Sequence, residues 1–292
     1  MKIEQNSFII GDLGSASIGA NKGYVDIARA LSALNGKNIC QTKRKDGKYK
    51  PLTYLVRVRA LIGDAMVESL NNGYPTRNAV VLAGAARDAM LKSAGVSRSN
   101  LESYQKELRI TMDRAQVEGN TWLPGATALG TTDADLPASA QTNAYGMNLV
   151  YDYTDLVYDD PSNPGTDVQV QMCMLGSTII DGPVMPLVYN WSQWRHNFTP
   201  SAAADDIADN AISYVMQQSS TADKIIDIVE DEADEKPYQL SDFTTKTMPD
   251  VVGTTVGNPT TSVISAPLGL LKITTGSSGC SLQIEVVGVS EL

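Results

Sequence analysis

The stretch Asp167–Arg195, which reads DVQVQMCMLGSTIIDGPVMPLVYNWSQWR, decides the fold class. From Val168 to Met174 every second residue is apolar, the period of two that is typical of a half-buried β-strand. A turn with Gly176 and a Gly-Pro break follow, and the composition then predicts a second strand over 184–191. The strand residues contain no acid, base or nucleophile in a catalytic spacing. The stretch therefore indicates the wall of a β-protein rather than a reaction centre.

The length, the composition and the few Cys and His residues predict a folded chain without a metal or membrane partner. The 292 residues are 42% hydrophobic and 19% charged, which suits one large domain or two modest ones. No apolar run approaches about 18 residues, so we expect no transmembrane helix, and residues 1–20 do not form a convincing signal peptide. The three Cys and the single His196 are too scattered for a structural zinc site, and we expect neither a metal site nor a cofactor.

The pattern along the chain predicts a mainly β protein with helical insertions. An apolar stripe over Tyr24–Asn35, followed by Gly36, predicts a helix. Helical insertions are expected at roughly 76–108, with Thr76 as the N-cap, and at 202–235. Eight strands are expected, at 37–45, 52–62, 108–114, 147–158, 167–175, 184–191, 263–274 and 280–289.

Connections between the expected strands vary from two residues to insertions of roughly 40, so regular βαβ crossovers are absent. We therefore expect a single jelly-roll β-sandwich over one domain, residues 1–292, with strands within 37–62, 108–114, 147–191 and 263–289. The alternative is the α+β fold of tailed-phage shells, which a continuous helix over Arg77–Met112 would favour.

Charge is divided unevenly between the two parts of the chain. Residues 1–120 hold 18 Lys and Arg against 11 Asp and Glu, whereas residues 121–292 hold 5 against 22. Such a division is typical of a chain that presents one face to an anionic partner, or of two halves that neutralise each other.

A basic hairpin is the strongest candidate for a nucleic-acid contact. Asp46-Gly47 between two extended arms favours a type I′ turn. Lysines and arginines around it could hold phosphates while Tyr49 stacks on a base. The return arm alternates, so Arg57 and Arg59 share one strand face. The predicted nucleic-acid-binding residues are Lys43, Arg44, Lys45, Lys48, Lys50, Arg57 and Arg59. The alternative is a soluble hairpin tip that discourages edge aggregation.

Catalytic patterns are weak. A Ser or Cys triad needs a His, and His196 lies in a polar run. Two carboxylates facing across a cleft could serve a glycosidase, and the loop at Asp159–Asp160 could hold calcium. Carboxylates cluster in the sequence at Asp152, Asp155, Asp159, Asp160 and Asp167. A second acidic run, Glu230–Glu235, fits the solvated end of a helix. No catalytic residues are predicted.

Three blocks together resemble capsid proteins of small circular single-stranded DNA (CRESS-like) viruses. They are DIARALSALNGKNICQ (Asp26–Gln41), CMLGSTIIDGPVMPLVYNWSQWR (Cys173–Arg195), and APLGLLKI with SLQIEVVGV (Ala266–Ile273 and Ser281–Val289). They cover about 55 of the 292 residues, and none is a catalytic motif. Such coats often carry an Arg-rich N-terminal arm, whereas residues 1–21 hold one basic residue, Lys2.

The resemblance implies a coat protein, not an enzyme, that self-assembles into an icosahedral shell around a DNA genome. It implies a location in the virion after synthesis in a host cell. The basic hairpin Lys43–Lys50, together with Arg57 and Arg59, would face the interior, and Glu230–Glu235 would face outward or toward neighbours. Trp191, Trp194 and Arg195 are expected at a subunit contact, because Trp and Arg often anchor interfaces. A tailed-phage shell or tail protein and a carboxylate-using β-sandwich hydrolase are the alternatives.

Overall fold

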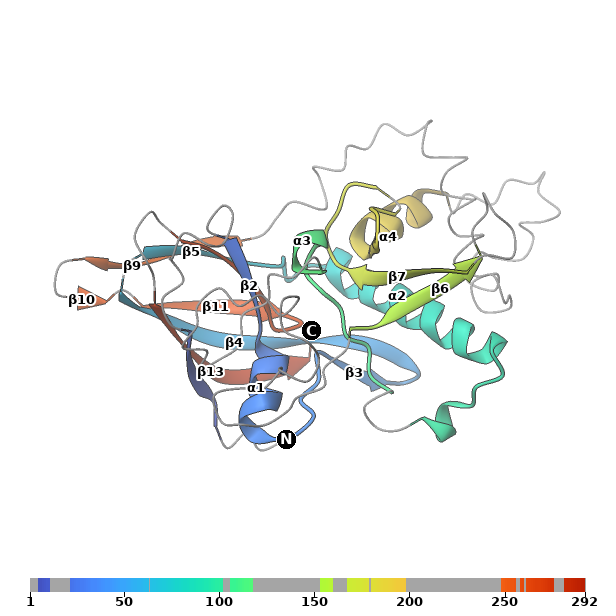
Figure 1. The fold of residues 1–292 in the computed structure, drawn as a ribbon, viewed down its shortest axis with the longest axis horizontal. Coiled ribbons are helices and arrows are strands. Elements are labelled where there is room, and N and C mark those ends of the chain that lie inside the picture. Colours follow the sequence, from blue (N-terminus) through green and yellow to red (C-terminus); the bar gives the residue numbers. More distant parts are fainter. Residues whose placement is uncertain are drawn as a thin grey trace.

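The computed structural model describes residues 5–10, 22–62, 64–101, 106–117, 153–159, 167–178, 180–197, 248–255, 258–259, 261–275 and 281–291. Within these residues the chain is mainly β, with mostly antiparallel strand pairs and few helices (Figure 1). The coarse prediction of a mainly β protein with helical insertions is confirmed.

Eight strands form a frame of two sheets. We call this set the frame strands: β1 (Ser7–Ile10), β2 (Lys22–Asp26), β4 (Lys48–Ile62), β5 (Asp64–Ser69), β9 (Met248–Thr255), β11 (Thr261–Pro267), β12 (Leu270–Thr275) and β13 (Ser281–Glu291). One sheet has the order β1-β13-β4-β11, and β3 (Thr42–Lys45) also pairs with β4. The other has the order β10-β9-β5-β12-β2, where β10 is Asn258–Pro259.

The antiparallel pairs of the frame are nested. β1 pairs with β13, β2 with β12, β4 with β11, and β5 with β9. Counted along the chain, the first frame strand pairs with the eighth, the second with the seventh, the third with the sixth, and the fourth with the fifth. The pairs β13–β4 and β12–β5 then join these units into the two sheets.

One hydrophobic core joins the two sheets. Alternate residues of β4, such as Val56 and Val58, are fully buried and belong to the same cluster as Val67 of β5 and Ile273 of β12. The helix α1 (Ile27–Asn35) packs into this cluster through Leu31, and the left-handed Gly36 ends it, with φ of 58°. The predicted helix was too long at its start, because residues 22–26 form β2 instead.

Between the fourth and fifth frame strands the chain builds a second unit with its own core. Its elements are α2 (Tyr74–Ser93), the 3-10 turn η2 (Arg98–Asn100), α3 (Arg114–Val117), β6 (Asp155–Asp159), β7 (Asp167–Cys173), β8 (Val184–Pro186) and α4 (Leu187–Asn197). Figure 1 shows α2 and α4 beside the β6-β7 strands, at the other end of the molecule from β9 and β10. Met172, Trp191 and Ala83 meet in this second core.

Several sequence-based boundaries were wrong. The strand expected over 184–191 ends at Pro186, and the helix α4 follows, because Leu187, Val188 and Trp191 are buried with helical rather than alternating spacing. The segment 108–114 is not a strand, although Thr111 forms an isolated bridge to Cys173.

Two further expectations change at the turns. The strand predicted over 263–274 is divided by Leu268 and Gly269, whose φ angles are 59° and 71°, so that β11 and β12 lie in different sheets. α2 begins at Tyr74, and Thr76 lies inside it rather than capping it. Since α2 ends at Ser93, the continuous helix over Arg77–Met112 is not formed. The expected helices at 202–235, the acidic run 230–235 and residues 147–152 lie outside the described residues.

Candidate nucleic-acid interface

The β3–β4 hairpin has the predicted turn. Asp46 and Gly47 both have positive φ angles, 54° and 76°, as a two-residue type I′ turn requires. The type I′ prediction is therefore confirmed, and the turn fixes the register of every basic residue on the hairpin.

That register places lysine opposite lysine. Lys43 pairs with Lys50, and Lys45 pairs with Lys48. We call these four residues the lysine ladder. Like charges directly across a sheet repel, so the ladder needs anions nearby. The carboxylate of Glu291, from the end of β13, supplies one: it contacts Lys43 Nζ and lies 3.6 Å from Lys45 Nζ.

The opposite face of the hairpin carries Arg44 and Tyr49, which are directly paired. Tyr49 is 2% exposed, and its hydroxyl donates a 3.0 Å hydrogen bond to the carbonyl of Lys106. A buried ring is not available to stack on a base. The predicted base-stacking role of Tyr49 is therefore wrong, and the ring anchors the hairpin in the second core instead.

Asp88 of α2 joins two arginines above that ring. Its carboxylate oxygens lie 2.9 Å from Arg44 Nη2 and 3.1 Å from Arg98 Nη1. Both guanidinium groups also lie over the Tyr49 ring, at 5.6 and 5.2 Å from its centroid, within the range of cation–π attraction. We call Arg44, Asp88 and Arg98 the arginine–aspartate cluster. Sequence reasoning missed Asp88 and Arg98, because nothing local ties them to the hairpin.

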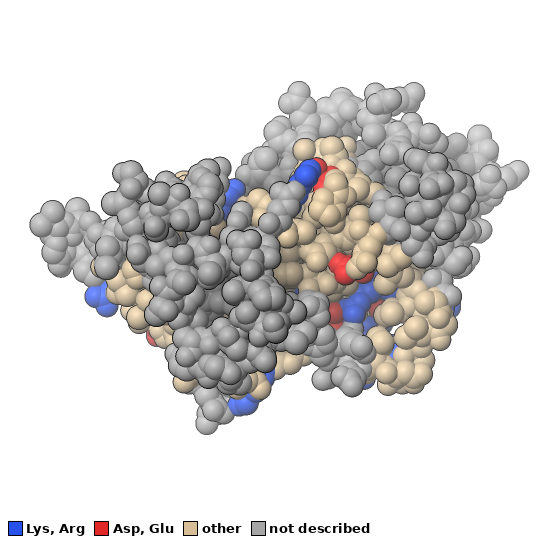
Figure 2. Space-filling model, viewed as in Figure 1, with Lys and Arg blue, Asp and Glu red and all other residues tan. Residues whose placement is uncertain are grey.

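A pocket of about 440 Å³ opens beside this cluster, between the hairpin and the C-terminal end of α2. Its lining residues are Arg44, Asp88, Leu91, Lys92, Gly95, Val96, Ser97 and Arg98. The backbone turns here at Gly95, whose φ of 68° ends the helical path. On the face viewed in Figure 2, some blue and red side chains lie next to one another, whereas the blue side chains at the left and lower edges stand apart.

Arg57 and Arg59 lie farther along β4. Both are exposed on the same face of the strand, as the alternation predicted. Arg57 donates a 2.8 Å hydrogen bond to Glu285, its direct partner on β13. The seven predicted nucleic-acid residues therefore occupy three places rather than one: the lysine ladder, the arginine–aspartate cluster and the outer sheet face.

Trp191 was expected at a subunit contact, and the structure places it inside the chain. It is 4% exposed, and its ring meets Tyr74 edge-on, with centroids 5.7 Å apart and an interplanar angle of 76°. The burial in the second core accounts for Trp191 without a partner subunit. Trp194 and Arg195 lie in α4, but their side chains are outside the described residues.

A buried carboxylate ties α1 to the rest of the fold. Asp26 caps the helix by accepting a 3.0 Å hydrogen bond from the backbone N–H of Arg29. It also accepts from the Gln41 amide at 2.8 Å and from the Tyr153 hydroxyl at 3.1 Å. Burial raises the pKa of Asp26 to about 6, against the opposing effect of these hydrogen bonds. With its oxygens so engaged and 1% exposed, it has a structural role.

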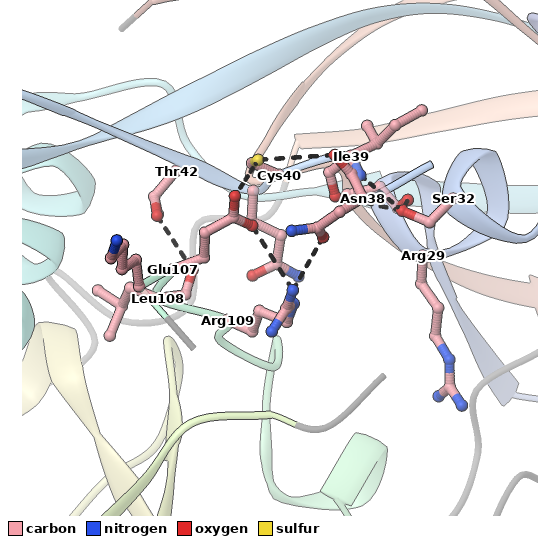
Figure 3. Close-up of polar contacts among 12 residues, drawn as sticks. Arg29, Ser32, Asn38, Ile39, Cys40, Thr42, Glu107, Leu108 and Arg109 are labelled. Carbon is pink, nitrogen blue, oxygen red and sulfur yellow. Dashed lines mark hydrogen bonds and ion pairs between the residues drawn. The ribbon is translucent and has the colours of Figure 1, made fainter. Parts of the chain in front are cut away.

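Cys40, Glu107 and Arg109 point toward one another below the hairpin (Figure 3). The Cys40 thiol donates to the Glu107 carboxylate, and Arg109 lies 3.6 Å from that carboxylate and donates to Asn38 at 2.9 Å. Burial, followed by the hydrogen bond to Glu107 and then by the charge of that carboxylate, raises the pKa of Cys40 to about 12. A thiol in this state is a poor nucleophile, because the thiolate is the reactive form.

Of the five clustered carboxylates, Asp152 to Asp167, the structure describes one side chain, that of Asp155. Asp155 accepts a 2.6 Å hydrogen bond from Gln169, and the side chains of Asp159 and Asp167, Asp152 and Asp160 lie outside the described residues. Across the part of the chain that the structure describes, no group of three or more His, Cys, Asp or Glu could hold a metal ion. No helix within that part is long and apolar enough to span a membrane.

Comparison of the chain with protein-family models, with curated proteins and with solved structures finds no match.

Proposed function

We propose that the chain is a structural capsid protein with a single jelly-roll fold, which self-assembles into an icosahedral shell around a nucleic-acid genome. The observation that carries the proposal is the nested pairing of the frame strands, first with eighth through fourth with fifth. This order results when a long two-armed antiparallel hairpin is rolled into two sheets. Eight-stranded rolls of this kind occur in viral capsids, and also in lectins and cupins.

The outer face of the β1-β13-β4-β11 sheet supports assembly. Leu55 and Val263 are 42% and 56% exposed there, on two adjacent strands. Apolar residues gathered on an exposed surface often mark protein contacts. The same face carries Arg57 and Glu285, so it offers both charges to a second copy of the chain. Closed symmetry multiplies such individually weak contacts.

The lysine ladder supports binding to the genome. Four lysines face one another in pairs, and within the described residues one carboxylate, Glu291, contacts two of them. This arrangement favours a polyanion that neutralises several lysines together. The proposal places the ladder toward the interior of a shell, keeps Trp194 and Arg195 as subunit contacts, and takes DNA as the genome and the virion as the location from the sequence resemblance. It assigns no catalytic activity.

The test uses particles purified from cells that express the chain. After nuclease treatment, the protected nucleic acid is compared between the native chain and a variant with Lys43, Lys45, Lys48 and Lys50 changed to Gln. We expect particles from both, with the nucleic-acid content strongly reduced in the variant. A control variant, Lys37→Gln with Arg114→Gln, removes exposed cations elsewhere and should package normally. Normal packaging by the ladder variant would contradict the interior assignment, and absence of particles from the native chain would contradict the coat function.

A further inference from the structure

The pocket beside the arginine–aspartate cluster has the chemistry of an anion site. Three of its lining side chains are cationic, Arg44, Lys92 and Arg98, and one is a carboxylate, Asp88. The lining therefore keeps an excess of positive charge after the internal ion pairs are formed. At about 440 Å³ the pocket is large enough for a phosphate group.

The guanidinium groups are held in place before any ligand arrives. Asp88 contacts one nitrogen of Arg44 and one of Arg98, and each guanidinium has five N–H donors in a planar fork. Arg98 also donates to the Tyr49 hydroxyl and, at 2.8 Å, to the carbonyl of Lys106. Such pre-positioned forks match the oxygen geometry of phosphate, and little side-chain entropy is lost on binding.

The same geometry argues against reading of bases. Tyr49, whose ring lies under both arginines, is buried, and the pocket lining contains no aromatic side chain. Proteins that bind single strands without sequence preference usually stack bases on aromatic rings, and this lining offers no ring for that purpose. We propose that the pocket binds one backbone phosphate of the packaged nucleic acid, without contact to a base. The identity of the phosphate's source rests on the proposed function, whereas the affinity of the pocket for phosphate does not.

The test measures binding of a short fluorescein-labelled oligothymidylate to the full chain over a range of salt concentrations. Lys92→Gln and Arg44→Gln should each weaken binding, and each should reduce the slope of log affinity against log salt by about 0.7 for a lost phosphate contact. Lys92 is exposed, so its substitution tests the pocket even if Arg44→Gln disturbs the hairpin. Arg114→Gln, an exposed cation outside the pocket, is the matched control and should change neither quantity.

An abasic oligonucleotide of the same length should bind as tightly as the oligothymidylate. Unchanged slopes in Lys92→Gln and Arg44→Gln, or loss of binding to the abasic strand, would overturn the proposal. A second arm measures the rise in unfolding temperature with inorganic phosphate, which should be smaller in both variants than in the control. If phosphate stabilises the native chain through these residues but no oligonucleotide binds, the phosphate site is supported and the proposed genome-coat function is contradicted.

Discussion

Gly84 lies so close to Tyr49 that a Cβ atom added at Gly84 would be 2.2 Å from Cδ2 of the ring and 2.8 Å from Cγ. Real Cβ atoms do not approach other atoms this closely. The missing side chain on α2 therefore lets the hairpin ring enter the second core, and this contact fixes the basic hairpin against the helix.

The first prediction follows from this contact. Ala has a higher helix propensity than Gly by about 1 kcal/mol, so Gly84→Ala in an open helix would stabilise the protein. Here the overlap with Tyr49 should reverse the sign and lower the free energy of unfolding by about 1–3 kcal/mol. Denaturant unfolding measures it. Gly288→Ala, where nothing lies within 4 Å, is the control and should have little effect, whereas a more stable Gly84→Ala variant would refute the contact.

Trp191 gives a second prediction, about stability rather than assembly. Because the ring is buried in the second core, Trp191→Ala should lower the free energy of unfolding by about 3–5 kcal/mol. Tyr74 is 53% exposed, and Tyr74→Ala removes only its edge contact with Trp191. This variant should therefore lower the free energy of unfolding by about 1 kcal/mol. Denaturant unfolding of both variants decides the matter. If Trp191→Ala leaves stability unchanged but abolishes oligomers, Trp191 is a subunit contact after all.

Asp26 predicts a pH dependence of stability. Its pKa is raised from 3.8 to about 6 in the folded chain, so the folded state binds the proton more tightly than the unfolded state. The contribution of protonated Asp26 to the free energy of unfolding is fully present below about pH 4, and it is lost as the pH rises through about 6. The loss amounts to about 3 kcal/mol, the shift converted at 1.36 kcal/mol per unit.

Unfolding free energies of the native chain and of Asp26→Asn, measured between pH 4 and 7, test this dependence. The difference between the two should change across that window in favour of the native chain at low pH, because other carboxylates contribute equally to both. If the unfolding free energies of the native chain and of Asp26→Asn change with pH in parallel, the pKa of Asp26 is not raised in the folded chain.

Cys40 supplies a fourth prediction. With its pKa raised to about 12, the thiol should react with iodoacetamide at pH 8 far more slowly in the folded chain than after denaturation. Mass spectrometry of the peptide that contains Cys40 measures the rate. Glu107→Gln removes the neighbouring charge and the strong hydrogen-bond acceptor, so it should speed the reaction. Equal rates in the folded and denatured chains would contradict the described environment.

The predictable parts of the fold were those with local causes. Asp46-Gly47 demands its turn, alternation along β4 exposes Arg57 and Arg59 together, and Gly36 ends α1. The helix α4 was missed because its β-branched and aromatic composition resembles a strand, while tertiary burial selects the helix.

The candidate site was only half visible in the sequence. The basic hairpin could be found from its own residues, but Asp88, Arg98 and Glu291 come from distant elements. Tyr49 was misjudged for the same reason, since Gly84 of α2 and Arg98, which help to bury its ring, are distant in the sequence. Nested strand pairing is likewise a property of the whole chain, not of any segment.

The proposed coat function is tested most directly by the molar mass of the purified, full-length chain in solution, from light scattering on a size-exclusion column. A self-assembling coat protein predicts closed particles in the megadalton range with a narrow distribution, visible as uniform shells by negative-stain microscopy. A monomer or small oligomer at every protein and salt concentration tried would contradict the account.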